Sequence, residues 1–179
     1  MAGGTHTYEL DVEWTGNRGA GTSGYRAYDR DHVIDAPGKD PIAGSADPAF
    51  RGARARWNPE ELLVASLAQC HMLWYLHLAA SAGVVVTAYR DRPTGTMVED
   101  SDSAGGGQFA EVTLRPHVIV TDPAMLETAR RVHDDVGTVC FVARSVNFPV
   151  HHEPAVQVGE HREWPPDGHP RADLRRVRG

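Results

Sequence analysis

One long apolar segment constrains the fold of this chain more than any other feature. It runs from Trp57 to Gly83, WNPEELLVASLAQCHMLWYLHLAASAG. Asn58 can cap a helix, Pro59 suits its first position, and Glu61 completes an N-x-x-E capping box. The segment therefore predicts a helix of roughly 24 residues, about 36 Å long and apolar on nearly every side. One small domain covers such a helix poorly, so we expect a partner subunit to cover the rest.

The same helix is not expected to cross a membrane. It carries polar side chains at Ser66, Gln69, His71 and His77, and such groups are costly inside a bilayer. The first residues, MAGGTHTYELDVEW, have neither the basic start nor the apolar run of a signal peptide. We therefore expect a cytoplasmic protein whose thiols stay reduced.

Composition places the chain among ordinary globular proteins. Its 179 residues include 24 acidic and 18 basic side chains, with a formal charge of −6, whereas phosphate binding requires a basic face. We expect no nucleic-acid partner. The length suits one domain. We place this domain at residues 1–158 and a Pro- and Arg-rich tail at residues 159–179.

Strands are predicted before, between and after two helices. Alternating or apolar patterns predict extended segments at residues 7–14, 25–34, 84–89, 95–98, 109–120 and 147–158. Residues 123–139 fit a second helix, with Asp122 as its cap and Cys140 at its end. Residues 35–56 and 101–107 have the composition of loops. Because strands come in pairs between the helices, this order favours an α+β fold.

The two cysteines, Cys70 and Cys140, allow two interpretations. Buried, inert thiols are common, because Cys is among the most buried residue types. The alternative is a redox or nucleophilic pair. Cys70 lies in the middle of the long helix and needs a nearby cation to become a thiolate. The candidates are Arg18 and the arginines between residues 51 and 56.

Neither a metal nor a nucleotide is expected. The chain has ten histidines, but they show neither the Cys/His spacing of a zinc site nor an H-E-x-x-H pair. His71, beside Cys70, is interpreted as a packed helix residue. The glycine-rich stretch TGNRGAGTSG, residues 15–24, resembles neither a P-loop nor a dinucleotide-binding turn.

Four stretches together resemble the OsmC/Ohr family of thiol-dependent hydroperoxide reductases. They are NPEELLVASLAQCH at residues 58–71, TVCFVARS at 138–145, WTGNRGAGTSG at 14–24 and NFPV at 147–150. The resemblance covers roughly residues 7–158. It implies an α+β, OsmC-like fold in an intertwined homodimer, whose long central helices are wrapped by antiparallel strands of both chains. The active sites would lie at the subunit interface.

The resemblance also implies a reaction without a cofactor. Cys70 would attack an organic hydroperoxide and become a sulfenic acid, which condenses with Cys140 to a disulfide. A dithiol reductant, often a lipoyl-bearing protein in this family, would restore both thiols. Arg18 would stabilise the Cys70 thiolate, and Glu60 would hold that arginine. Arg26 or Arg30 are alternatives to Arg18.

Two alternatives to a peroxidase remain open. One is a small-molecule or lipid-binding dimer that keeps the fold, with apolar residues near Cys70 lining a pocket. The other is a structural protein with two inert thiols. The distance between the two cysteines discriminates among them, since a disulfide needs Cα atoms within about 7 Å.

Overall fold

The computed structural model describes residues 3–101 and 106–159, and its central element is the predicted helix. Helix α1 spans Pro59–Ser81, and the Asn58 side chain accepts from the backbone N–H of Glu61 while the Glu61 side chain accepts from that of Asn58. Both halves of the predicted capping box are therefore present. Past the end of the helix, Gly83 adopts a φ of +76°, a left-handed conformation that favours glycine.

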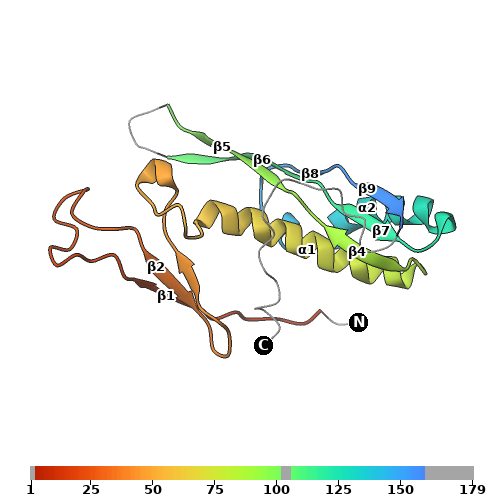
Figure 1. The fold of residues 1–179 in the computed structure, drawn as a ribbon, viewed down its shortest axis with the longest axis horizontal. Coiled ribbons are helices and arrows are strands. Elements are labelled where there is room, and N and C mark those ends of the chain that lie inside the picture. Colours follow the sequence, from red (N-terminus) through yellow and green to blue (C-terminus); the bar gives the residue numbers. More distant parts are fainter. Residues whose placement is uncertain (1–2, 102–105, 160–179) are drawn as a thin grey trace.

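The strands form three small sheets, of which the first lies beyond the start of α1 (Figure 1). The first sheet contains β1 (Asp11–Trp14), β2 (His32–Asp35) and β3 (Ile42–Gly44). The second sheet contains β4 (Val86–Arg90), β7 (His117–Val120) and β9 (Ala155–Val158). The third sheet contains β5 (Thr94–Glu99), β6 (Gly107–Leu114) and β8 (Val150–His152). The pairings β6–β8 and β7–β9 are parallel, where we expected antiparallel strands only. Both parallel pairings join strands that precede the second helix to strands that follow it, as parallel connections require.

The second helix is close to its prediction but begins with a tighter turn. A 3-10 turn at Pro123–Met125 is capped by Asp122 and leads into α2, Leu126–Val139. The larger core cluster joins both helices to the β4–β7–β9 sheet, through Tyr75, Ala79, Val84, Val118, Val120, Ala129, Val132, Val136, Cys140 and Val156. A smaller cluster packs Leu67 of α1 against Val112 and Leu114 of β6.

Several predicted segments differ from the structure. The strand predicted at residues 147–158 is two strands, β8 and β9, in two sheets, and only residues 11–14 of the segment 7–14 form a strand. The single strand predicted at residues 109–120 is two strands in two sheets, separated at Arg115 and Pro116. Pro116 has no N–H for a ladder, and the N–H of Arg115 binds the Asp91 carboxylate instead. Only residues 32–34 of the segment 25–34 belong to a strand, β2. The predicted loop 35–56 contains β3 and a 3-10 turn at Pro48–Phe50.

The first sheet forms an arm that extends away from the rest of the chain (Figure 1). The apolar side chains that alternate along the predicted segment 7–14 are exposed, from Tyr8 at 86% to Trp14 at 42%. Helix α1 buries a single stripe, Leu67, His71, Tyr75 and Ala79, although it is apolar on all sides. One chain thus leaves apolar surface uncovered on both α1 and the arm.

Helix α1 is also long and apolar enough, by length and composition alone, to cross a membrane. A core helix of a soluble protein passes the same test. Helix α1 packs against α2 and the β4–β7–β9 sheet, but only 22% of its apolar window is buried in one chain. The expectation of no membrane therefore stays a prediction. The predicted tail lies, apart from Gly159, outside the described residues, as does most of the predicted turn at 101–107.

Candidate functional site: the cysteine pair

The structure brings the two cysteines into contact. Cys70 lies in the middle of α1, and Cys140 follows the last residue of α2. The Cys140 thiol donates to Cys70, with 2.8 Å between the two Sγ atoms, and both cysteines are free. Cys140 is 2% exposed, whereas Cys70 is half-buried. Two thiols 70 residues apart in sequence therefore form one site with an inner and an outer sulfur.

The two thiols are not equivalent, because the inner one is poorly placed to ionise. Burial raises the pKa of the Cys140 thiol to about 11, and its hydrogen bond to Cys70 adds to the rise. The backbone N–H groups of Ala143 and Val142 oppose that rise in pKa only in part. At neutral pH Cys140 keeps its proton, so it can donate to a thiolate at Cys70. The catalytic roles of the two thiols stay a prediction.

A group of histidines borders the cysteines, and the sequence did not reveal it. The rings of His71 on α1 and His133 on α2 are hydrogen-bonded, with His71 Nε2 3.0 Å from His133 Nδ1. Tyr75 stacks on His133 with ring centroids 4.0 Å apart. His152 of β8 lies against both imidazoles and binds Asp134 at 3.2 Å. His71 is therefore a packed residue, as interpreted, but it also belongs to a polar network.

Burial keeps the two inner imidazoles neutral. Desolvation, with a smaller contribution from His152, lowers the pKa of His71 to about 4. Desolvation, His71 and His152 lower the pKa of His133 to about 3. One signal could have found His133: it occupies the buried face of an amphipathic helix together with Ala129, Val132 and Val136.

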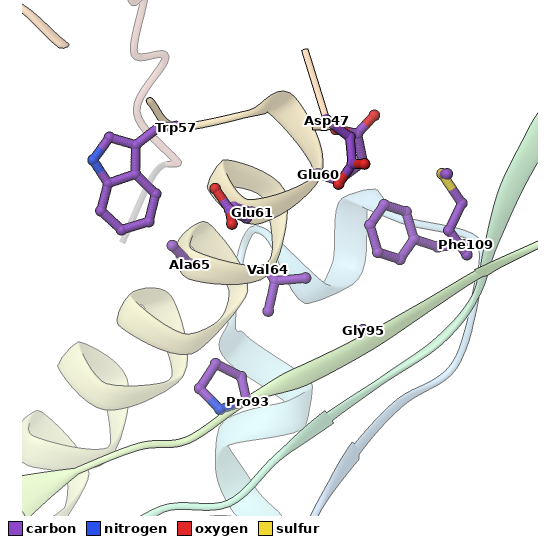
Figure 2. Close-up of a pocket in the computed structure, with 10 residues that line it drawn as sticks. Asp47, Trp57, Glu60, Glu61, Val64, Ala65, Pro93, Gly95 and Phe109 are labelled. Atoms are coloured by element: carbon purple, nitrogen blue, oxygen red, sulfur yellow. The ribbon is translucent and has the colours of Figure 1, made fainter. Parts of the chain in front are cut away.

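Glu60, the predicted partner of an arginine, lies at the start of α1 in a separate pocket. Within the described residues, its Oε2 is buried and has no hydrogen-bond partner. The pocket has a volume of about 550 Å³, and Figure 2 shows Glu60 at its edge with Trp57, Val64 and Phe109 around it. An added Cβ at Gly95 would lie 2.7 Å from both Phe109 and Val64, so glycine keeps this pocket open.

Arg18, Arg26 and Arg30 lie in the arm, and the chain does not bring Arg18 to Glu60. Of the candidates between residues 51 and 56, Arg56 pairs with Asp31 at 3.1 Å. Arg18 binds the carbonyls of Ala27 and Arg26 and lies 3.7 Å from the Asp29 carboxylate, all inside the β1–β2 connection. Arg30 lines the same hollow as Glu60. Its guanidinium lies over the rings of Tyr25 and Tyr28 and donates to the backbone carbonyls of both residues. No ion pair of Glu60 with an arginine occurs among residues 3–101 and 106–159.

No cluster in the described part of the chain has the geometry of a metal centre. Groups of three or more His, Cys, Asp or Glu side chains that could hold a metal ion do not occur there. The imidazole nitrogens that approach one another are hydrogen-bonded to each other. What the site offers is therefore thiol and imidazole chemistry.

Comparisons with known proteins bear on the family and the fold of the chain. A model of the family described as OsmC-like protein matches residues 52–154. An OsmC-like protein of unknown function from Vibrio cholerae has a TM-score of 0.73 at 29% identity, over 84% of this chain and 99% of that one. No curated protein matches.

Two further solved structures have lower identity and show the fold alone. An organic hydroperoxide resistance protein OsmC from Legionella pneumophila has a TM-score of 0.62 at 15% identity, over 87% of this chain and 100% of that one. An organic hydroperoxide resistance protein from Elizabethkingia anophelis has a TM-score of 0.60 at 16% identity, over 86% and 99%. These likenesses confirm the predicted α+β, OsmC-like fold. Because the family model also matches more than half of its residues, the chain belongs to the OsmC-like protein family.

Proposed function

We propose that this protein is a thiol-dependent peroxidase that reduces organic hydroperoxides to alcohols. The observation that carries the proposal is the contact between Cys70 and Cys140, with 2.8 Å between their sulfurs and no other cysteine in the chain. A resolving thiol has to stand this close to the sulfur that is oxidised. The names of the Legionella and Elizabethkingia proteins support the choice of substrate class.

The reaction begins at Cys70, the more exposed sulfur. Its thiolate forms a bond to the distal oxygen of ROOH, the O–O bond breaks, and the alkoxide leaves as ROH with a proton from solvent. The Cys140 thiol then attacks the sulfenic acid, an S–S bond forms, and one water molecule leaves. A dithiol, which we expect to be a lipoyl-bearing protein, reduces the disulfide by exchange and is itself oxidised.

A second subunit would complete the site. Glu60 and Cys70 are ten residues apart on one helix, which is about 15 Å along its axis. A peroxide bound beside Glu60 therefore does not reach Cys70 of the same chain. We infer that a partner chain supplies the arginine, Arg18, Arg26 or Arg30, that stabilises the Cys70 thiolate, together with the unpaired Glu60 oxygen that this arginine meets.

The proposed reaction requires a reducing compartment. Cys70 and Cys140 are free thiols in the structure, and a dithiol has to return them to this state after each turnover. The cytoplasm keeps thiols reduced, so we place the protein there.

A single-turnover experiment tests the proposal. Reduced protein is treated with one equivalent of cumene hydroperoxide, and thiols and intact mass are measured. We expect both thiols to disappear with a mass loss of about 2 Da, the two hydrogens of the thiols. The Cys70→Ser variant should lose all turnover, whereas Cys140→Ser should gain oxygen at Cys70 as sulfenic and then sulfinic acid. Turnover retained in Cys70→Ser would contradict the proposal.

One observation favours a second candidate, a binding protein for small apolar molecules. The pocket beside Glu60 has a volume of about 550 Å³ and is lined by Trp57, Val64, Met97 and Phe109, a size and character usual for ligand sites. Two thiols that stay unreacted in the peroxide experiment would move this candidate to the front. A pocket that takes the organic part of a hydroperoxide that reacts at Cys70 of the partner chain reconciles the observation with the peroxidase.

A further inference from the structure

The resolving thiol opens into a small pocket of its own, distinct from the pocket beside Glu60. Its volume is about 180 Å³, enough for several water molecules at about 30 Å³ each. Cys140 lines this pocket together with three histidines, His71, His151 and His152. The remaining walls are mostly apolar. The arrangement concentrates imidazoles around the sulfur that has to lose a proton for the disulfide to form.

His152 is the imidazole with a fixed orientation toward a carboxylate. Its Nε2 lies 3.2 Å from Asp134 Oδ1, and the Asp134 side chain is 76% exposed while that of His152 is 30% exposed. An ionised carboxylate only accepts hydrogen bonds, so Nε2 carries the proton in this pair. The other nitrogen, Nδ1, then has a lone pair and can accept a proton.

We propose that His152, oriented by Asp134, accepts the proton of Cys140 through water in this pocket when the disulfide forms. The proposal rests on the proposed peroxidase function. The Cys140 S–H bond breaks and the proton passes to His152 Nδ1. The resulting thiolate bonds to the sulfur of the Cys70 sulfenic acid. The hydroxyl leaves and takes the proton back from His152 as water, so atoms and charge balance.

The groups that face His152 make it a better candidate than its neighbours. On α1 and α2 it faces His71 and His133, which burial keeps neutral and whose lowered pKa values, about 4 and about 3, make them weak bases. The remaining charged neighbours are engaged elsewhere. His151 lies 3.8 Å from Glu111, and Glu153 binds Arg115 at 2.9 Å. Asp134 alone pairs with His152 in the described structure.

A two-step reaction with Ellman's reagent tests the inference without any peroxide. The reagent forms a mixed disulfide with Cys70 and releases one thionitrobenzoate. Cys140 then attacks this mixed disulfide and releases a second. The second thionitrobenzoate leaves without being protonated by an acid. The rate of its release therefore reports how easily Cys140 loses its proton. Cys140→Ser should release only one equivalent. Failure of the peroxidase proposal would appear in the hydroperoxide experiment and leave this measurement intact.

His152→Gln should slow the second release at least about tenfold at pH 7 and leave the first release unchanged. In His152→Gln the rate of the second release should rise about tenfold per pH unit, because solvent hydroxide then has to deprotonate Cys140, whose pKa is about 11. The matched control His151→Gln should behave as wild type. Imidazole in the buffer should restore the rate of His152→Ala, which a purely structural role would not allow.

Asp134→Asn keeps the inference testable if His152 variants fail to fold, because the Asp134 side chain is largely exposed. This variant should slow the second release by a smaller factor and displace its pH profile. Equal second-step rates in wild type and the His152 variants would overturn the inference. So would an equal loss in His151→Gln, or a pH profile of Asp134→Asn identical to that of wild type.

Discussion

The hydrogen-bonded imidazoles of His71 and His133 make the stability of the protein depend on pH. Both are nearly inaccessible to water, and each has a pKa lowered from 6.5, to about 4 for His71 and about 3 for His133. Between each lowered pKa and the ordinary value of 6.5, the unfolded chain therefore binds more protons than the folded one. Stability is fully present above pH 6.5 and is lost as pH falls toward 4 and then 3.

Replacement of His71 by Gln, which does not titrate, isolates this effect. Between pH 7 and pH 4 the free energy of unfolding of wild type should fall by about 3 kcal/mol more than that of the variant, from the pKa shift of His71 at 1.36 kcal/mol per unit. Urea denaturation at each pH measures the difference. His77→Gln, on the exposed side of the same helix, should retain the wild-type slope. Parallel curves for wild type and His71→Gln would contradict the assignment.

At this scale the sequence predicted the thiols but not what surrounds them. Cys70 and Cys140 stand in motifs that resemble a family, and their contact follows from the fold. His71, His133 and His152 come from three elements, and no spacing in the sequence joins them. The arginine is a different case. In the described residues Arg18 contacts its own hairpin, through Ala27 and Asp29, and a role at Cys70 rests on the proposed partner chain.

Among the secondary-structure elements, helix α1 depends for its stability on the Asn58 cap at its start. The Asn58 side chain accepts from the Glu61 N–H at 2.7 Å, and Asn58 is 5% exposed, so water cannot replace this bond easily. Asn58→Ala should lower the free energy of unfolding by about 1 kcal/mol. Asn58→Asp, whose carboxylate caps equally well, should lose little. Urea midpoints measure both, and equal midpoints for Ala and Asp would contradict a role for the cap.

Element boundaries were predictable where local chemistry decides them and not where partners do. The start of α1 follows from its own capping residues. The strand predicted at residues 109–120 has a continuous alternating pattern, yet β6 and β7 belong to different sheets because β8 and β9 offer two separate edges. Strand β3 is three residues long and pairs with β2, so its sequence carries no pattern of its own.

For the whole molecule, the uncovered apolar surfaces predict an obligate association. Val12 on β1 is 63% exposed, beside Leu10 at 65%. A charge there should be buried and unpaired if a second chain covers this face. Val12→Glu should therefore shift the protein toward monomer in sedimentation velocity and reduce peroxidase activity. Glu13→Gln, on the opposite face of the strand, should leave both unchanged. A wild-type protein that is monomeric at micromolar concentration would contradict the dimer.

The order of the elements along the chain has a consequence for biosynthesis. Cys70 is made 70 residues before Cys140, and β8 and β9, which complete two of the sheets, come later still. At about 5–20 residues per second, the ribosome delivers the second thiol roughly 4–14 s after the first. During that interval the nascent chain carries a thiol with no resolving partner on a helix with no cover. A peroxide that reaches Cys70 in that interval can oxidise it beyond the sulfenic acid, because no second thiol is yet present to form a disulfide.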